Sequence, residues 1–229
     1  MFNSGEFSSM LKSGNFSKIH VGDYIVRNIT IDGVTYSNHI DIIVDLNPYY
    51  GKANPSLSDT TRITTNHVAI IPYNRLGKAE KMNTTDSTST GFKNSSMHNT
   101  TLSKYLNAYR SAYGSDHIMQ FGHLVTTSTD ANGVASNWSW ESTYITLMTE
   151  VQVFGSTVFS NARDVGEGCS QLFGFVICPP LQNYQNTPYW LRGIASSSEY
   201  SHASADGIAN KDKAANSEYY WCRPLLMLI

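Results

Sequence analysis

The chain has 229 residues, a formal net charge of −2 and only 15% charged residues, while 41% apolar residues are enough to form a core. Without a basic block the sequence does not favour nucleic-acid binding, and without an apolar run of about 18 residues it does not predict membrane insertion. Three cysteines without a Cys-x-x-Cys pair argue against a disulfide framework and against a structural zinc site.

The N-terminal third begins with a polar segment without periodicity, residues 1–18, which predicts a linker or the end of a stalk ahead of one domain at 19–229. Further on, Asp32-Gly33 lies between alternating apolar and polar residues and is a strong hairpin signal. The strands expected here lie at residues 21–26, 39–46 and 67–72, with a polar loop at 48–65.

Two helices are predicted in the middle of the chain. The first begins at a cap formed by Thr100 or Thr101 and ends at Gly114, and the second begins at Ser142 and ends at Gly155. A polar loop precedes each helix, at residues 74–96 and 126–137. Their buried faces are expected to carry Leu102, Tyr105, Leu106, Tyr109 and Tyr113 in the first helix, and Tyr144, Leu147, Met148 and Val151 in the second.

The last part of the chain is predicted to alternate loops and strands. A glycine-punctuated loop at 158–171 precedes a strand at 173–179, and a turn-rich stretch follows it. Strands at 189–193 and 222–228 enclose a hairpin around Asp206-Gly207. The order of strands, helix, helix and strands predicts an α+β fold, mainly antiparallel, in which the first and last strands are able to pair.

The C-terminal stretch from Tyr189 onward has two apolar ends around a polar middle. Apolar ends must be buried, so we expect them to be neighbouring core strands that hold the middle at both ends and expose it to solvent. That middle is rich in Ser, Asn, Asp, Lys and Tyr, a mixture typical of antibody-like recognition surfaces. A β-rich secreted or viral protein would also explain the same composition.

Few residues match a catalytic or metal-binding pattern. The seven histidines show no metal-ligand spacing, and no Walker, Rossmann or serine-hydrolase motif occurs. Cys169 is flanked by glycines and could act as a nucleophile only if folding supplied His123 or His202 as a base. Three loop carboxylates could offer oxygens to calcium, but they lack an EF-hand spacing: Asp164, Glu167 and Asp206. We therefore predict no catalytic residue, no metal and no cofactor.

Two cysteines and two arginines lie in apolar surroundings. Cys178 and Cys222 are expected to be buried thiols, and a bridge between them is the alternative. Arg192 and Arg223 each lie in a short apolar strand, where an unpaired buried charge would be costly. Both are expected to bond backbone carbonyls or a carboxylate and so to fix the ends of the polar middle, with direct ligand contact as the alternative.

Several motifs, taken in their order, resemble a known family. Tyr189-Trp190-Leu191-Arg192, then Asp206-Gly207, then Arg223-Pro224 before a terminal apolar strand resemble the ending of C-type-lectin-like domains in phage surface proteins. Upstream motifs resemble a run found in such proteins of gut and Firmicutes phages: residues 141–155, 164–166 and 170–172. With entry motifs at residues 12–16 and 21–24, the resemblance covers roughly residues 12–229.

The sequence also departs from that family. Gly193 stands where Ser is usual and Cys222 where Val is usual, and neither change removes the frame of the fold. The Glu-Pro-Asn and Trp-Asn-Asp signatures of calcium-dependent sugar binding are absent.

The resemblance implies a C-type-lectin-like fold and an adhesin domain of a phage tail or head fibre, on the virion surface. Its partner would be a host-cell surface protein or glycan, and a homotrimer on a fibre is compatible with it. Many relatives are variable proteins of diversity-generating retroelements, whose diversified residues lie in this C-terminal stretch. The structural frame would be Trp190, Leu191, Arg192, Arg223 and Pro224.

Between the frame residues, the resemblance and the residue chemistry together predict a ligand-binding surface. Its members are Ser197, Ser198, Glu199, Tyr200, His202, Asn210, Lys211, Asp212, Lys213, Asn216, Glu218, Tyr219, Tyr220 and Trp221. Two alternatives remain open. One is a structural fibre or capsid decoration domain without receptor contact. The other is an enzyme of the formylglycine-generating branch of the same fold, which would need reactive cysteines such as Cys169 and Cys222 close together.

Overall fold

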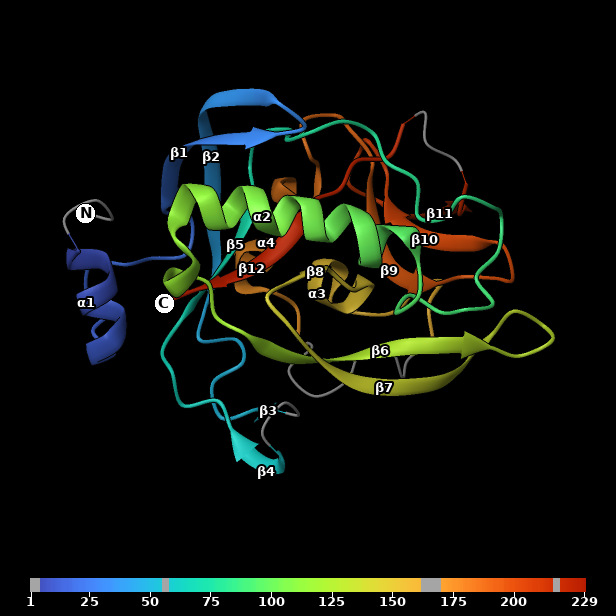
Figure 1. Ribbon diagram of the computed structural model, residues 1–229, viewed down its shortest axis with the longest axis horizontal. Helices are drawn as coiled ribbons and strands as arrows, with labels where there is room; N and C mark the ends of the chain where they lie inside the picture. The colour runs from blue at the N-terminus through green and yellow to red at the C-terminus, as the bar shows by residue number, and fades with distance from the viewer. Residues whose placement is uncertain (1–4, 55–57, 162–169, 216–218) are drawn as a thin grey trace.

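The computed structural model describes residues 5–54, 58–161, 170–215 and 219–229. They form an α+β fold of mostly antiparallel strands, as predicted from the sequence (Figure 1). The helices are α1 (Glu6–Ser13), the π-helix η2 (Met97–Thr101), α2 (Leu102–Tyr113), the 3-10 helix η3 (Ser115–His117), α3 (Glu150–Phe154), α4 (Phe173–Ile177) and the 3-10 helix η5 (Pro179–Gln182). The strands are β1 (Tyr24–Ile31), β2 (Val34–Leu46), β3 (Ala53–Asn54), β4 (Ser58–Arg62), β5 (Val68–Pro72), β6 (Phe121–Thr129), β7 (Ala135–Thr143), β8 (Ile145–Leu147), β9 (Tyr189–Ile194), β10 (Glu199–Ala203), β11 (Ala209–Lys213) and β12 (Pro224–Leu228).

The central sheet has the strand order β1-β2-β5-β12-β8. The last strand, β12, lies inside it, because Leu226 is paired with Ile70 of β5 on one side and with Ile145 of β8 on the other. The first strand, β1, lies at the edge and pairs with β2, so the first and last strands do not pair. The hairpin between β1 and β2 explains this placement: Asp32 and Gly33 both have positive φ, which suits a type I′ turn.

Core residues cover both faces of the central sheet. Along β12, Leu226 and Leu228 pack with α2 residues on one face, while Leu225 and Met227 pack in a second cluster on the other face. All of β5 and β12 is buried. A strand covered on both faces is apolar throughout, which is why both strands appear as continuous apolar runs in the sequence.

The predicted first helix is confirmed as α2, and Gly114 ends it. Its beginning differs, since η2 precedes it and the Thr101 side chain makes no capping hydrogen bond. The segment before it, predicted as a polar loop, contributes three fully buried core residues: Leu76, Met82 and Phe92.

The predicted polar loop at 126–137 and the predicted helix from Ser142 are both wrong. Residues of both segments form the antiparallel β6–β7 hairpin and β8, and the helix α3 begins only after Thr149. Thr149 and Gln152 form a reciprocal capping box, and Gly155 ends α3 in the left-handed region as expected. The apolar spacing between residues 144 and 151 fits a helix as well as a strand, and pairing with neighbouring strands decided the outcome.

The strand predicted at 173–179 is also wrong, because residues 173–177 form α4. A short apolar run does not by itself distinguish a strand from a buried helical turn. Cys178 at its end is exposed rather than buried, whereas Cys222 is buried as expected. Both thiols are free, so the alternative bridge between them is not formed. Cys169 lies outside the described residues.

A helix, α1, occupies much of the segment that was predicted as a linker. Phe7, Met10 and Leu11 of α1 belong to the main core cluster. Ser8 Oγ donates a hydrogen bond to the Ile229 carbonyl at 3.2 Å, so α1 lies beside the end of the chain (Figure 1). No helix within the described ranges is long and apolar enough to cross a bilayer.

Arg223 is a buried charged residue that connects separate segments of the core. Its Nε donates to the Pro72 carbonyl at 3.1 Å and its Nη1 to the Leu181 carbonyl at 2.8 Å. The guanidinium lies 4.6 Å from the ring centre of Tyr184 and 4.9 Å from that of Tyr189. The prediction that this arginine bonds backbone carbonyls is confirmed.

Replacing Arg223 with Met should destabilise the protein by about 2–4 kcal/mol, because two buried carbonyls lose their donors. The free energy of unfolding from urea titrations measures this. Arg75→Met is the matched control: Arg75 is exposed and contacts the Trp221 ring at 5.7 Å, so its loss should cost less than about 1 kcal/mol. Equal losses in the two variants would contradict the role given to Arg223.

His67 makes the stability of the fold sensitive to acid. Burial lowers the pKa of His67 to about 4, although its Nδ1–H donates to the Thr65 carbonyl at 2.8 Å. Its Nε2 accepts the Tyr49 N–H at 3.1 Å and therefore has to stay unprotonated. An unfolded histidine has a pKa of about 6.5, so the unfolded chain takes up a proton first as the pH falls.

The stabilisation from neutral His67 should be complete above about pH 6.5 and lost as the pH falls toward 4. From pH 7 to pH 5 the loss should be about 2 kcal/mol in the free energy of unfolding. In His67→Gln this part of the pH dependence should disappear, whereas His20→Gln, at an exposed site, should keep it. An unchanged pH dependence in His67→Gln would contradict the assignment.

Candidate functional site

The two apolar ends of the C-terminal stretch meet at Trp221. The Trp190 N–H donates to the Trp221 carbonyl at 3.1 Å, and the Trp221 N–H donates to the Pro188 carbonyl at 3.0 Å. β9 and β12 belong to different sheets. An isolated bridge between Tyr189, the first residue of β9, and Trp221, three residues before β12, joins them. The polar middle between them is held at both ends, as the sequence predicts.

The predicted frame residues are all buried. Trp190 is fully buried, and its Nε1–H donates to the Glu80 carbonyl at 2.7 Å. Arg192 bonds a backbone carbonyl, as expected, since its Nη1 donates to the Leu124 oxygen. The same Nη1 lies 3.2 Å from Nδ1 of His123 on β6. Arg192 therefore connects β9 to the β6–β7 hairpin.

Gly193 has no space for a side chain. A Cβ on Gly193 would lie 2.5 Å from the Ser160 Cβ. Ser160 is held in place by Glu150, whose buried carboxylate accepts the Ser160 hydroxyl at 2.6 Å and the Ser160 N–H at 2.9 Å. The role of Glu150 was missed from the sequence, and an acidic residue directly after a Thr cap was the available signal.

A hollow of about 560 Å³ lies beside this frame. Its lining comes from the turn before β9, from β10 and β11, and from the segment before β12. The lining includes Asn186, Thr187, His202, Asn210, Tyr219 and Trp221. Polar groups and aromatic rings thus surround one open concavity, which is the usual composition of a binding site.

Predicted ligand-binding residues fall into three groups by exposure. The exposed ones are Ser197, Asn210, Lys211, Lys213 and Tyr219, and the half-buried ones are Ser198, Glu199, Asp212 and Trp221. The buried ones are Tyr200, His202 and Tyr220. Asn216 and Glu218 lie outside the described residues, as do the calcium candidates Asp164 and Glu167, and the third candidate, Asp206, is exposed.

The prediction of outward aromatic contact area is therefore corrected for two tyrosines. Tyr200 is fully buried in the main core cluster. The Tyr220 ring packs 4.4 Å from Trp190 and 4.5 Å from His202 between ring centres, and its hydroxyl donates to Asp212 Oδ2. Both belong to the frame, because Tyr200 lies in a stretch of β10 that is buried from Tyr200 to Ala203, and Tyr220 packs on Trp190. Tyr219, with 61% exposure, remains on the surface.

His202 forms part of the floor of the hollow. It is buried, and burial lowers the pKa of its imidazole, so it is neutral at physiological pH. Its Nδ1 is buried without a hydrogen-bond partner among the described residues. His202 therefore contributes to the hollow as a buried, neutral ring packed behind its surface.

Ion pairs fix the rim of the hairpin. Lys211 Nζ lies 2.8 Å from Glu199 Oε2, and the Ser196 hydroxyl donates to the same carboxylate at 2.7 Å. These two donors lower the pKa of Glu199. Lys213 lies 3.8 Å from Asp86, on the segment before η2. The rim is therefore hydrophilic, and these contacts hold some of its charged side chains in position.

A second cluster was missed from the sequence because its members are far apart in the chain. His98, His123 and Glu141 bring their ligand atoms within 4.8 Å of one another. Burial lowers the pKa of His123 to about 3. Burial alone would raise the pKa of Glu141, but contacts with His123 and His98 outweigh it and hold that pKa well below its usual range. The cluster thus combines two imidazoles with one carboxylate.

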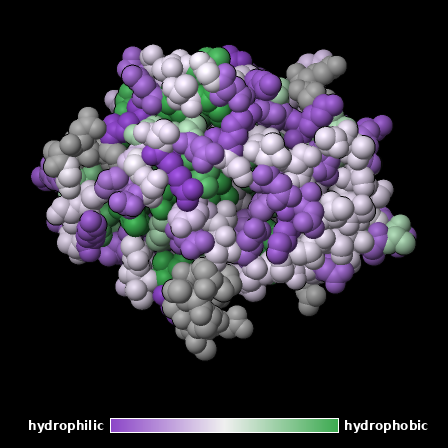
Figure 2. Space-filling model, viewed as in Figure 1, coloured by the Kyte–Doolittle hydropathy of each residue, from purple (hydrophilic) through white to green (hydrophobic). Residues whose placement is uncertain are grey.

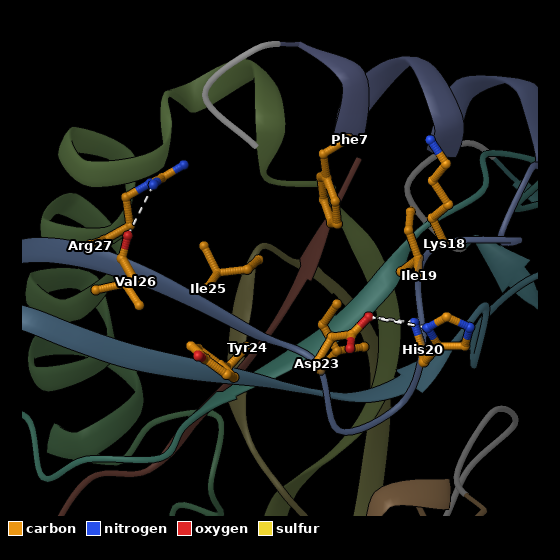
Figure 3. A pocket seen from close by; sticks show the side chains of 10 residues that line it. Phe7, Lys18, Ile19, His20, Asp23, Tyr24, Ile25, Val26 and Arg27 are labelled. Carbon is orange, nitrogen blue, oxygen red and sulfur yellow. Dashed lines mark hydrogen bonds and ion pairs between the residues drawn. The ribbon is translucent and has the colours of Figure 1, made fainter. Parts of the chain in front are cut away.

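A different hollow, of about 450 Å³, lies between α1 and β1 (Figure 3). Phe7 of α1 and Ile25 of β1 point into the space between these elements. Its charged groups have local partners, because Lys18 pairs with Glu6 at 3.1 Å and Asp23 accepts the His20 N–H at 2.8 Å. Five predicted ligand-binding residues line the hollow beside Trp221, and none of the predicted set lines the hollow at α1: His202, Asn210, Tyr219, Tyr220 and Trp221.

Comparisons with protein-family models, with curated proteins and with solved structures found no match. What supports a function is the geometry of the hollow beside Trp221 and of its frame.

Tyr219 and Tyr220 are neighbours with different roles, and alanine substitutions separate them. Tyr220→Ala removes a ring packed on Trp190 and should cost about 3 kcal/mol of the free energy of unfolding. Tyr219→Ala removes an exposed ring and should change stability by less than about 0.5 kcal/mol. Thermal and urea unfolding measure both variants, and equal destabilisation would contradict the division between frame and surface.

Proposed function

We propose that this chain is a receptor-binding adhesin domain of a phage, with a C-type-lectin-like fold, and that it binds a host-cell surface protein or glycan. It would act on the virion surface as part of a tail or head fibre. The motifs at 189–192, 206–207 and 223–224 support the family, and the antiparallel α+β architecture is compatible with it.

The observation that carries the proposal is the separation of a buried frame from an exposed surface. Trp190, Arg192 and Arg223 are buried, while the hairpin β10–β11 and Tyr219 present polar and aromatic groups around the hollow. Rigid aromatic groups and adaptable polar groups together are typical of recognition surfaces. Many copies on a virion would add avidity to weak individual contacts.

The position of this surface in the molecule also supports an adhesin. The β10–β11 hairpin lies at one end of the molecule, and α1 and the last residue lie at the other (Figure 1). In the same view, strong hydrophobic colour gathers in the half that holds α1 and β1, whereas the opposite end is mostly hydrophilic or nearly neutral, with pale green at its tip (Figure 2). The hairpin also exposes one aliphatic residue, Ile208. A hydrophilic surface pointing away from the described ends of the chain is suited to contact with a separate partner.

The exposed residues also fit the diversification that the family resemblance implies. Ser197, Asn210, Lys211, Lys213 and Tyr219 are exposed on strands and turns that the frame holds in place. Changes at such positions cost little stability, because exposed side chains away from caps and buried networks contribute little to folding.

Two alternatives to an adhesin follow from the sequence. In a decoration domain a neighbouring copy would cover the hollow and Tyr219 on its rim, so the exposure of Tyr219 in an assembled fibre separates that function from an adhesin. An enzyme of the formylglycine-generating branch would need reactive thiols, but burial raises the pKa of Cys222 well above its ordinary value. A thiol that stays protonated is a poor nucleophile. We therefore infer binding and not catalysis.

A cell-binding assay tests the adhesin function. Fluorescent beads carrying many copies of the domain are incubated with a panel of gut bacteria, and the bound fraction is measured. Bound wild-type beads are expected with at least one host, and a variant with four surface substitutions to Ala should bind at least about tenfold less. The substituted residues are Asn210, Lys211, Lys213 and Tyr219.

The matched control carries the same residue types substituted at exposed positions elsewhere. Those positions are Asn107, Lys12, Lys18 and Tyr24. The control should bind like the wild type, and both variants should unfold at the wild-type temperature within a few degrees. Unchanged adsorption of the four-substitution surface variant to the same host would contradict the adhesin proposal.

A further inference from the structure

Three chain segments converge at one point beside the β6–β7 hairpin. His123 of β6 and Glu141 of β7 are directly paired across the hairpin, so their side chains share one face. His98 comes from η2 and brings its Nε2 to 3.3 Å from Glu141 Oε2. All three ligand atoms lie within 4.8 Å of one another.

Two atoms at this point are buried without a hydrogen-bond partner among the described residues. They are His123 Nε2 and Glu141 Oε2, which lie 3.8 Å apart. His123 is 98% buried, with only 2% of its surface exposed. Buried polar atoms nearly always have a hydrogen-bond partner. Two neighbouring buried atoms without one therefore need an explanation, and a bound ion is one.

The rings are held in orientations that suit a metal. Nδ1 of His98 lies 3.2 Å from Asn99 Oδ1, and when its N–H donates a hydrogen bond to that oxygen the lone pair of Nε2 is free. The His98 ring is also packed edge-on against Phe92 at 5.2 Å, and the His123 ring against Phe121 at 6.1 Å. Both imidazoles are therefore fixed before any ion arrives.

We propose that His98, His123 and Glu141 bind a divalent transition-metal ion, with Zn²⁺ as the preferred ion. Two imidazole nitrogens and one carboxylate are a usual zinc ligand set and leave a fourth position for water. Calcium and magnesium prefer sites made of oxygen atoms and are not expected here. Side-chain exposures of 13% for His98 and 23% for Glu141 give the ion a route from solvent.

The positive charge of Arg192 beside His123 should lower the affinity of the site for a cation. Its Nη1 contacts Nδ1 of His123 at 3.2 Å and also donates to the Leu124 carbonyl. When Nε2 binds a metal, Nδ1 carries the proton, so Nη1 gives up this contact and keeps the Leu124 carbonyl. The negative charge of the Glu141 carboxylate offsets part of the positive charge that the bound ion brings. Affinity should therefore be lower than that of a four-ligand structural zinc site.

The ion would join η2 to the β6–β7 hairpin, next to the proposed recognition surface. The hairpin turn at Gly133 lies directly against the backbone of Ser197, and Thr88, ahead of η2, donates its hydroxyl to the Ser196 carbonyl at 2.8 Å. Bound metal would stiffen the support of the turn between β9 and β10. The metal site rests on its own geometry and does not depend on the adhesin function.

Calorimetric titration of the chelator-treated full chain with ZnCl₂ tests the proposal. We expect one ion per chain, no binding of CaCl₂, and tetrahedral absorption bands when CoCl₂ replaces zinc. His98→Gln and Glu141→Gln should each weaken zinc binding by at least about tenfold. Both residues are partly exposed, so their variants should fold, and unfolding temperatures measured in EDTA check this.

His20→Gln is the matched control, since His20 also lies near a carboxylate, 3.5 Å from Asp23, but at an exposed site. This variant should bind zinc like the wild type. Absence of zinc binding by the wild-type chain would overturn the proposal. Wild-type affinity in folded His98→Gln and Glu141→Gln, or equal loss in His20→Gln, would do the same, because the ion would then lie elsewhere.

Discussion

The backbone hydrogen bonds of Trp221 and Tyr220 hold the proposed recognition surface in place. Trp221 accepts the N–H of Trp190 and donates to Pro188, while Tyr220 accepts the N–H of Glu80 at 2.8 Å. Three separate segments are thus joined where the exposed middle returns to the core. Main-chain bonds need no particular side chain, so this clamp persists when surface residues around it change.

Side chains behind the clamp give it rigidity. Trp190 contacts Tyr220 and His202 through ring faces and edges, and Arg223 lies against the rings of Tyr184 and Tyr189. Large buried rings contribute much apolar area and have few rotamers, which favours one arrangement. The surface in front can then vary its polar groups without altering the position of the backbone.

The β6–β7 hairpin has a double role in this arrangement. Its base receives Arg192 through the Leu124 carbonyl and His123, and its turn lies against Ser197. Two buried atoms without a hydrogen-bond partner among the described residues, His123 Nε2 and Glu141 Oε2, lie at the first of these contacts. An ion bound at these atoms, as proposed, would stiffen the hairpin that supports the proposed recognition surface.

The sequence by itself determined the features that depend on local geometry. These are the Asp32-Gly33 turn, the glycine ends of α2 and α3, the apolar strands β5 and β12, and the carbonyl bonds of two arginines in apolar strands. Tertiary structure alone decided the rest, because those features depend on partners distant in the chain. They are the strands at 126–147, the helices α1 and α4, the burial of Tyr200 and Tyr220, and the meeting of His98, His123 and Glu141. Short segments fit two periodicities equally well, and only pairing or packing with remote residues selects one of them.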